Sequence, residues 1–436
     1  MDTLRGYSGW GGCADVFSDK PEWRTIRDAI EQALTPEEYA QARASTLTAY
    51  YTPGPVVKAM WDALDIGPTP IQVLEPGCGT GNFMAGIPDD VAAHVSGVEL
   101  DPISARIAAA LNPYATILNA DLADCTIQQG SFDLAIGNVP YSGDISLDYR
   151  TTDGGTSRLP LHDYFIERSV DALRPGGVAM LLTSRYTLDK RSETMRADLA
   201  RKAELIGVVR LPSSTFARQA GTEAVTDVLV LRRRERTLDR TPDEAWIHST
   251  PIAVPGYQDV TVNVNQAVAN DMPTHAVGDI RPVIGRFGGD FDVVFQGGTE
   301  QIGERLRDDA LHADRPRQAA VAAGRDGTGR TRGGHRPPGP CDPVRILGRP
   351  SRRGLVRRRR HRHRGRPRSG RRGAPTARHD PPARPGARTP TPRTRPRPRG
   401  RPRRGGQTQG TRPGIRPVHR RVRTPERPRQ PPRLRQ

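Results

Sequence analysis

The chain has 436 residues and a formal net charge of +19, but its positive charge is concentrated in one part. Residues 1–300 carry 26 Lys and Arg against 40 Asp and Glu, whereas residues 301–436 carry 41 against 8. Because the first part is acidic, the net positive charge of the chain is no argument that this part binds nucleic acid. The first part is long enough for a catalytic domain with appendages.

The cysteines and the apolar runs indicate the compartment. Cys13, Cys78, Cys125 and Cys341 are scattered and form no C-x-x-C pair, which argues against a zinc site or a disulfide framework. The N-terminus lacks the apolar core of a signal peptide, and no apolar run approaches the about 20 residues that span a bilayer. We therefore expect a soluble cytoplasmic protein with no metal site and no membrane partner.

The predicted elements begin with a helical N-terminal extension over residues 1–47. Within it, Thr35 is the expected N-cap of a helix over residues 36–44, with Glu37 and Glu38 near the positive end. Strands and helices then alternate over residues 48–236. Strands are predicted at residues 71–74, 95–100, 116–119, 132–136, 178–182, 205–210 and 225–231, and helices at residues 55–64, 102–111, 161–173 and 193–202. This alternation predicts a Rossmann-like α/β domain with a mainly parallel seven-stranded sheet covered on both faces.

The rest of the chain carries weaker signals. Residues 237–297 are interpreted as a small β-rich appendage or as the start of a truncated domain. Residues 298–436 form an Arg/Pro-rich tail that contains no Lys, Phe, Trp, Tyr or Met after residue 300, and we expect it to be disordered. One interpretation is a nucleic-acid-binding arm. The other is a frameshift product, because Arg, Pro, Gly and Ala have GC-rich codons.

A glycine-rich turn, Glu75 to Gly81, follows the first predicted strand of the domain directly. Its glycines permit a tight turn and a close approach of ligand to backbone, although this signal alone is weak. Glu99 ends the next strand, where an acid is placed to accept hydrogen bonds from a ribose diol. Asp121 follows the third strand, where an acid can accept from an adenine amine. Each acid alone is equally well explained as an exposed loop charge or a helix cap, but the three strand ends in this order favour a nucleotide cofactor.

The tetrapeptide Asn138-Val139-Pro140-Tyr141 follows the apolar strand at residues 132–136. It is therefore expected at the carboxyl edge of the sheet, where ligands bind in open α/β folds. An amide, a backbone carbonyl fixed by proline and an aromatic ring in one turn are suited to a planar exocyclic amine and the ring that carries it. The sequence thus predicts that an amine is the group acted upon.

Residues 48–234 resemble the adenine-N6 DNA methyltransferases of the Asn-Pro-Pro-Tyr type, in which the cofactor motif precedes the catalytic motif. The resemblance rests on Tyr51-Thr52-Pro53, the glycine turn and the tetrapeptide, in that order. It implies a class I S-adenosylmethionine-dependent methyltransferase fold, S-adenosylmethionine as cofactor, and DNA methylation in a restriction-modification or anti-restriction context. The chain departs from the family at Val139, where proline is commoner, so the stiffness of that turn is in question.

A second resemblance concerns the N-terminal segment. Gly9-Trp10-Gly11-Gly12 and residues 34–39 are similar to the front of methylase–helicase proteins of phages and conjugative elements. This similarity implies DNA as a partner, together with a helicase or specificity domain that is missing from this chain.

The family resemblance implies a cofactor-binding set at the strand ends, namely Thr52, Glu75, Gly77, Gly79, Gly81, Glu99, Asp121 and Leu122. Thr52 is expected to contact the methionine carboxylate, and Glu75 with the glycines to hold the methionine part. Glu99 is expected to bind the ribose hydroxyls, and Asp121 with the Leu122 backbone to bind the adenine.

The implied catalytic residues are Asn138, Pro140 and Tyr141. The Asn138 side-chain oxygen and the Pro140 carbonyl would accept hydrogen bonds from the target amine, so that its lone pair localises towards the methyl donor. Tyr141 would stack on the extruded base. Phe216 is a candidate for the other side of that stack, and a core position explains it equally well.

Several functions remain open beside methylation of adenine in DNA. Protein glutamine methyltransferases also use Asn-Pro-Pro-Tyr, and an RNA base amine is a further acceptor. Phe83 after the glycine turn and the long extensions favour DNA. A catalytically inactive nucleic-acid-binding scaffold is the alternative outside the enzymes, and it need not bind the cofactor.

Overall fold

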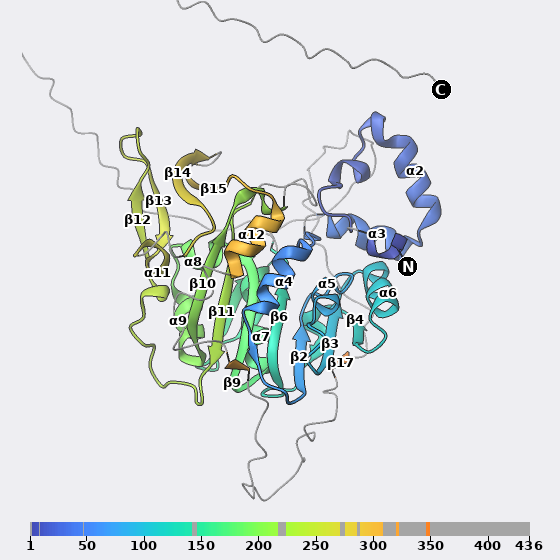
Figure 1. The fold of residues 1–436 in the computed structure, drawn as a ribbon. Helices are drawn as coiled ribbons and strands as arrows, with labels where there is room; N and C mark the ends of the chain where they lie inside the picture. Colours follow the sequence, from blue (N-terminus) through green and yellow to red (C-terminus); the bar gives the residue numbers. More distant parts are fainter. Residues whose placement is uncertain are drawn as a thin grey trace, which may run out of the picture. The chain divides into compact units, whose positions relative to one another are not determined.

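The computed structural model describes most of the first 307 residues and two short segments beyond them (Figure 1). The described residues are 2–7, 9–46, 48–141, 146–216, 224–270, 275–285, 288–307, 320–321 and 346–348. The Arg-rich stretches after residue 348, on which both interpretations of the tail rest, lie outside the described residues.

The N-terminal segment is helical. It contains α1 (Asp2–Arg5), the 3-10 turns η1 (Ala14–Phe17) and η2 (Pro21–Trp23), and the helices α2 (Arg24–Ala33) and α3 (Pro36–Ser45). Thr35 caps α3 as predicted. Its Oγ1 accepts a hydrogen bond from the backbone N–H of Glu38 at 3.2 Å, and the Glu38 carboxylate accepts one from the Thr35 N–H at 2.9 Å. This capping box fixes the point where the helix begins.

A seven-stranded sheet forms the centre of the fold. Its strands are β2 (Ile71–Glu75), β3 (Ala93–Glu99), β4 (Thr116–Asn119), β6 (Phe132–Asn138), β9 (Leu173–Ser184), β10 (Ala203–Leu211) and β11 (Thr226–Arg233). They are ordered β10-β11-β9-β6-β2-β3-β4, and within this sheet β11 runs in the direction opposite to the other six strands. The structure confirms the predicted class I methyltransferase fold with its mainly parallel sheet.

Helices cover both faces of this sheet (Figure 1). One face packs against α4 (Gly54–Asp62), α5 (Asn82–Ala85) and α6 (Pro102–Leu111), and the other against α7 (Leu161–Ala172) and α9 (Thr194–Lys202). Successive strand residues point to opposite faces, so Leu134 and Ile136 join the first cluster and Ala135 joins the second. Because β6 is buried on both sides, its sequence from Leu134 to Gly137 is an apolar run rather than an alternating one.

Hairpins extend this core. The sequence interpretation did not anticipate β7 (Ser146–Arg150) and β8 (Thr156–Pro160), whose residues are largely polar. The β-rich region expected after residue 236 contains two antiparallel pairs. They are β12 (Ser249–Ala253) with β13 (Thr261–Asn265), followed by α11 (Gln266–Ala269), and β14 (Asp279–Gly285) with β15 (Gly288–Val294).

The folded chain continues past the predicted boundary at residue 298. Helix α12 (Thr299–Arg305) lies beside α4 (Figure 1), and its Ile302 and the following residue Leu306 are 1% and 0% exposed. Gly303 touches the α4 start closely, since a Cβ there would lie 2.6 Å from the Pro55 carbonyl oxygen. The structure thus describes a helix within the first residues of the segment that the sequence analysis expected to be disordered.

Two short strand pairs involve later residues. β1 (Asp65–Ile66) pairs with β16 (Ala320–Val321), and β5 (Cys125–Thr126) pairs with β17 (Leu347–Gly348). Within the described ranges, the structure has no helix with the length and apolar character needed to traverse a bilayer.

Candidate active site

The candidate site lies at the carboxyl ends of the central strands. β2 pairs with β3 on one side and with β6 on the other, so the direction of the chain order reverses there, and ligands bind at such switch points. A cavity of about 250 Å³ opens at this edge. Most of the predicted site residues line it, namely Thr52, Glu75, Gly77, Gly79, Glu99, Asp121, Leu122, Asn138 and Pro140.

The glycine turn leaves no room for side chains on its cavity side. Gly79 has a φ of +54°, and a Cβ there would lie 2.3 Å from Cε1 of Tyr51. Gly81 has a φ of +84° and precedes α5, outside the lining of the cavity. Both positions require a left-handed backbone that glycine adopts without strain. The sequence prediction of a tight turn is explained by these two conformations.

Glu99 is held in place by backbone donors. Its Oε2 accepts a hydrogen bond from the Gly79 N–H at 2.8 Å, and its Oε1 accepts one from the Asp101 N–H at 2.7 Å. Burial raises the pKa of this carboxyl to about 7, while these backbone hydrogen bonds act in the opposite direction. Each oxygen retains a further lone pair that can accept a ligand hydroxyl.

Glu75 and Thr52 each present an unsatisfied polar atom. Glu75 is 2% exposed and Thr52 3% exposed. Among the described residues, Oε2 of Glu75 and Oγ1 of Thr52 have no hydrogen-bond partner. Burial, and next the charge of Glu99, raise the pKa of Glu75 well above its ordinary value. Buried polar groups are rarely left unpaired in native proteins, so a ligand with complementary groups is the expected partner here.

Asp121 lies where the sequence predicted it, after β4. Its Oδ1 accepts a hydrogen bond from the Ala123 N–H at 2.9 Å, so it caps a short 3-10 turn, η3 (Leu122–Asp124). It also lines the cavity with Leu122. The two interpretations of this acid, helix cap and ligand contact, are therefore compatible.

Asn138 is oriented by a neighbour that the sequence interpretation missed. Its Nδ2 donates a hydrogen bond to the carbonyl oxygen of Tyr50 at 2.7 Å. A carbonyl only accepts, so the amide has to turn its nitrogen towards Tyr50 and its oxygen the other way. In the part of the chain that the structure describes, this Oδ1 is buried and has no partner. Asn138 is therefore arranged to accept a hydrogen bond from a ligand donor.

The departure at Val139 has a structural compensation. The Val139 N–H donates a hydrogen bond to the carbonyl of Leu182 at 2.9 Å, and the side chain is fully buried. A proline at this position has no N–H and could not make this bond. The turn is thus tied to strand β9, which answers the question about its stiffness.

Tyr141 stacks on Tyr50 with ring centroids 5.8 Å apart and an interplanar angle of 16°. Its hydroxyl is buried and unpartnered within the described ranges, and burial raises its pKa. Tyr141 does not line the first cavity. It lines a second one, next along the chain from Pro140.

Phe216 does not face either cavity. It is fully buried among the apolar residues between the sheet and α4. In this structure the ring occupies the core, and a stacking role would require it to leave that core.

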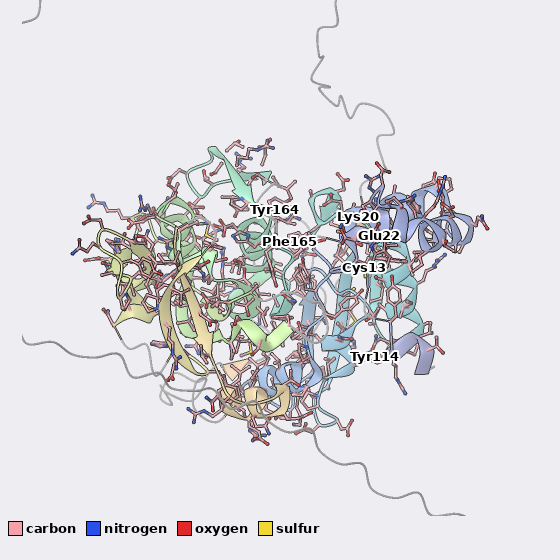
Figure 2. All side chains as sticks on the ribbon, turned by 90° about the horizontal axis from the view of Figure 1, so that it is seen from above. Cys13, Lys20, Glu22, Tyr114, Tyr164 and Phe165 are labelled. Carbon is pink, nitrogen blue, oxygen red and sulfur yellow. The ribbon has the colours of Figure 1, made fainter. Side chains whose placement is uncertain are left out.

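Three aromatic residues that the sequence interpretation did not place also line the first cavity. They are Tyr50, Tyr51 and Phe165. Phe165 comes from α7, where Figure 2 labels it beside Tyr164. The Tyr51 hydroxyl lies 3.0 Å from Oγ of Ser104, which fixes the ring over Gly79. A pair of tyrosines before Thr-Pro, in a chain with 5% aromatic residues, was the available signal.

No cluster of three or more His, Cys, Asp or Glu side chains suited to a metal ion occurs among the residues with described positions. The cavity instead offers a glycine turn, three buried acceptors and a ring of aromatic residues. The model of the N-6 DNA Methylase family matches residues 24–250.

The chain belongs to the N-6 DNA methylase family. The match covers the sheet, the tetrapeptide at residues 138–141 and all of the residues that line the cavity except Gly9 and Trp10. The predicted resemblance is thereby confirmed for the family.

The relatives of this N-6 DNA methylase family member have names that refer to different functions. It is 29% identical over 233 residues to the Defense against restriction protein B of Escherichia phage P1, a match that covers 50% of this chain and 10% of the phage protein. It is 28% identical over 195 residues to a Methanocaldococcus jannaschii protein provisionally named a protein N5-glutamine methyltransferase, covering 42% and 91%. The solved M protein of the type I restriction enzyme EcoKI is 16% identical, with coverage of 59% and 60% and a TM-score of 0.37. The chain thus spans about a tenth of its phage relative.

Proposed function

We propose that this chain transfers a methyl group from S-adenosylmethionine to the exocyclic N6 amine of adenine in DNA. The observation that carries the proposal is the orientation of Asn138. Its nitrogen is engaged by the Tyr50 carbonyl, which leaves an acceptor oxygen beside Pro140 at the mouth of the cavity. Membership of the N-6 DNA methylase family supports the choice of amine.

The residues of the first cavity fit the proposed cofactor. The unpartnered Thr52 hydroxyl suits the methionine carboxylate, and the Glu75 carboxylate suits the ammonium group. Gly77 and Gly79 keep the backbone open towards the ligand. Glu99 is placed for the ribose hydroxyls. Asp121, with the Leu122 backbone, is placed for the adenine. When bound, S-adenosylmethionine supplies an electrophilic methyl group on a sulfonium centre.

The chain's own residues would prepare the acceptor. An adenine amine is a poor nucleophile because its lone pair delocalises into the ring. Hydrogen bonds to Oδ1 of Asn138 and to the Pro140 carbonyl would draw both amine hydrogens out of the ring plane, so that the lone pair localises. With its lone pair localised in this way, the nitrogen would be prepared to accept the methyl group that a bound donor supplies, and its displaced proton would leave to solvent. Such preorganised acceptors act by position and electrostatics, without a covalent enzyme intermediate.

Tyr141 would hold the ring that carries the amine. A base in duplex DNA has to leave its stack to reach the site, at a cost of a few kcal/mol. Stacking on an aromatic side chain returns about 1–3 kcal/mol per base. The ring of Tyr141 is already fixed by its stack on Tyr50, so little conformational entropy is lost on binding.

A glutamine amide in a protein is the second candidate acceptor. The similarity to a protein named for N5-glutamine methylation favours it, and a planar amide offers the same pair of hydrogens to Asn138 and Pro140. We also propose that DNA is read with help from a helicase or specificity domain outside this chain. The phage relative named for defence against restriction supports a restriction-modification or anti-restriction context.

The deciding experiment is transfer of tritiated methyl from S-adenosylmethionine by the full chain, offered unmethylated double-stranded DNA or bacterial protein extract. We expect label in DNA that nuclease and phosphatase together release as N6-methyl-2′-deoxyadenosine. If only protease releases the label, the acceptor is a protein and not adenine in DNA. Binding of S-adenosylmethionine without any transfer would leave the inactive-scaffold interpretation.

The Arg-rich segment requires a control in this assay. It attracts phosphate irrespective of sequence, so DNA binding alone says nothing about the catalytic site. The Asn138→Ala variant keeps that segment and loses the proposed acceptor. Label that persists in this variant would contradict the mechanism.

A further inference from the structure

The second cavity, of about 770 Å³, begins where the catalytic tetrapeptide leaves the first one. Pro140 lines the first cavity and Tyr141 lines the second. The walls of the second come from the start of α7, from the end of β9 with α8 (Tyr186–Asp189), and from strand β15. The second cavity is therefore the candidate place for the rest of a molecule whose acceptor group is held at Asn138.

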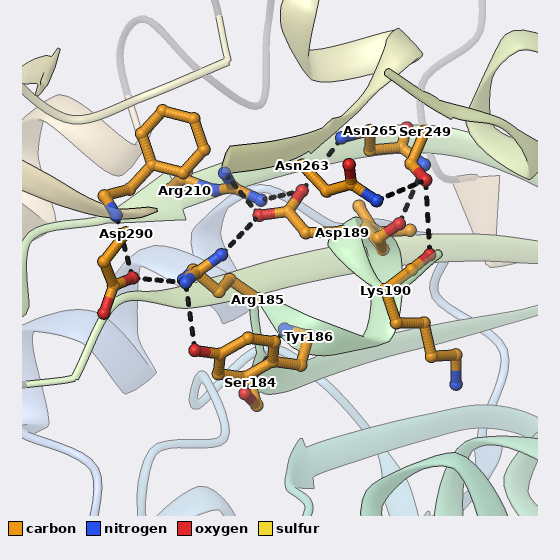
Figure 3. A network of polar contacts seen from close by, with 12 residues as sticks. Ser184, Arg185, Tyr186, Asp189, Lys190, Arg210, Ser249, Asn263, Asn265 and Asp290 are labelled. Atoms are coloured by element: carbon orange, nitrogen blue, oxygen red, sulfur yellow. Dashed lines mark hydrogen bonds and ion pairs between the residues drawn. The ribbon is translucent and has the colours of Figure 1, made fainter. Parts of the chain in front are cut away.

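Tyr186 is the exposed aromatic side chain of this cavity. It is 53% exposed, whereas Phe291 on the opposite element is 5% exposed. The guanidinium of Arg185 lies 4.2 Å from the centroid of the Tyr186 ring and donates a hydrogen bond to its hydroxyl at 3.0 Å (Figure 3). The ring is thus open to the cavity and yet held at both its face and its tip.

Arg185 is itself fixed by a network of buried charges (Figure 3). Its Nη1 donates to Asp189 at 3.1 Å, and its Nη2 donates to Asp290 of strand β15. Asp189 also accepts from Nη2 of Arg210 at 3.0 Å, and Arg210, which is fully buried, donates to Asp227 at 2.8 Å. Buried ion pairs are costly in desolvation and give rigid geometry when every member is paired. The network explains how an exposed tyrosine keeps one orientation.

The charges of the second cavity suit an uncharged ligand. Arg185 and Lys190 contribute positive charge, but Arg185 is paired with Asp290 and Lys190 with Asp163. Asp292 adds a further carboxylate to the lining. No unpaired cation of this lining among the described residues is available to a phosphate, so a neutral planar ring is favoured over a phosphate group.

Two buried polar atoms at this cavity also lack partners. Within the part of the chain that the structure describes, the Tyr141 hydroxyl and Nδ1 of His162 make no hydrogen bond. His162 is 7% exposed, and its Nε2 lies 3.5 Å from a carboxylate oxygen of Asp163. A neighbouring carboxylate favours the proton on Nε2, which leaves Nδ1 as an acceptor for a ring N–H or amine.

We propose that Tyr186 is a substrate-contacting residue that stacks on a nucleobase in the second cavity, the position for which Phe216 was a candidate from the sequence. This inference rests on the proposed function and deepens it. It names a planar nucleobase as the occupant and Tyr186 as the ring that receives it. A glutamine side chain has no ring to stack and would gain little from Tyr186.

The test uses the full chain and a neutral probe, 2-aminopurine riboside, whose fluorescence is quenched by stacking. A nucleoside without phosphate avoids the Arg-rich segment. Saturating S-adenosylhomocysteine occupies the cofactor cavity, so that the nucleoside does not enter it. We expect saturable quenching by the wild-type chain. Tyr186→Ala should weaken the apparent affinity about 10- to 100-fold, because base–aromatic stacking is lost. Tyr186→Phe keeps the ring and should stay within about threefold of the wild type.

Tyr257→Ala is the matched control, since Tyr257 is 55% exposed and lines neither cavity. Equal affinities for Tyr186→Ala and Tyr257→Ala, with both variants folded by circular dichroism, would overturn the inference. Absence of quenching by the wild-type chain would overturn it as well. The transfer assay reports separately on the proposed function. Quenching that depends on Tyr186 without transfer to DNA would retain the inference and reject DNA adenine as the acceptor.

Discussion

The side-chain nitrogen of Asn138 donates its hydrogen bond to the carbonyl oxygen of Tyr50, 88 residues earlier in the chain, at 2.7 Å. This contact decides which end of the amide faces the cavity. It also joins the N-terminal corner before α4 to the last residue of β6. The proposed chemistry depends on this contact between segments that are far apart in sequence.

Removal of the Asn138 amide should abolish most of the transfer and spare cofactor binding. Asn138→Ala deletes one of two acceptors for the target amine, and loss of one preorganised hydrogen bond costs about 10²–10³ in kcat. S-adenosylmethionine affinity, measured by calorimetry, should change by less than about threefold, because the cofactor contacts lie on other strands. Asn263→Ala, in strand β13, is the matched control and should keep wild-type kcat. Equal kcat in both variants would reject the role of Asn138.

Cofactor affinity should rise with pH around neutrality. Burial raises the pKa of Glu99 to about 7, and only the ionised carboxylate accepts hydrogen bonds on both oxygens. Below that pKa the group is protonated and the affinity falls, whereas above it the affinity reaches a plateau. The carboxylate fractions at pH 6 and pH 8 differ by about tenfold, so the dissociation constant should differ by about the same factor.

Glu99→Gln separates this effect from the neighbouring Glu75, whose pKa is also raised by burial. The variant should bind S-adenosylmethionine more weakly and with a flat profile between pH 6 and pH 8. Calorimetry in buffers of different ionisation enthalpy would detect the proton release directly. A profile in Glu99→Gln that matches the wild type would assign the pH dependence to another group.

Gly79→Ala should damage both the fold and the cofactor cavity. A left-handed backbone costs a non-glycine residue about 1–2 kcal/mol, and the new Cβ would lie 2.3 Å from the Tyr51 ring. We expect a lower midpoint of thermal unfolding and at least tenfold weaker S-adenosylmethionine binding. Gly67→Ala is the control, because a Cβ at Gly67 meets nothing within 4 Å. Similar behaviour of the two variants would show that the turn relaxes freely.

Val139→Pro restores the residue that is commoner in this family, yet it should destabilise this chain. The substitution removes the N–H that donates to the Leu182 carbonyl and leaves that buried acceptor unpaired. Such a loss costs about 1–3 kcal/mol in the free energy of unfolding, which urea denaturation can measure. Unchanged or increased stability would indicate that the rigidity of proline outweighs the lost hydrogen bond.

Truncation after residue 307 and truncation after residue 297 should differ in stability. The shorter chain loses α12, whose Ile302 and Leu306 are buried against the α4 side of the sheet. Burial of each aliphatic side chain contributes about 1.5–3 kcal/mol, so the free energy of unfolding should fall by about 3–6 kcal/mol. Ile302→Ala in the longer chain should reproduce about 2–5 kcal/mol of this loss. Equal stabilities would show that α12 is not part of the folding unit.

The sequence predicted those parts of the fold whose burial leaves a local pattern. Strand β6 is an apolar run because it is covered on both faces, and α6 begins at a proline after an acidic cap. Helix α2 was not predicted as a separate helix, although Ile26 and Ile30 recur at helical spacing in its sequence. Hairpin β7–β8 was missed because its residues are mostly polar and leave no apolar pattern.

The candidate site was predictable to the extent that its residues follow strand ends. Glu75 and Glu99 end two parallel strands and Asp121 lies two residues beyond the next one, and the ends of these strands meet at one edge of the sheet. Tyr50 orients Asn138 through its backbone carbonyl. Because every residue has this group, the identity of residue 50 could not reveal the contact in the sequence. The pairing of Arg185 with Asp290 joins residues 105 apart and follows only from the tertiary fold.

The two cavities are lined by residues that are synthesised at different times. The residues that line the first cavity lie between Gly9 and Phe165, but the second cavity is completed by Asp290, Phe291 and Asp292. A nascent chain thus exposes every side chain of the donor cavity while one wall of the acceptor cavity is still untranslated. In a chain that ends before Asp290, the first cavity keeps all of its lining residues, whereas the second cavity lacks the wall that strand β15 supplies.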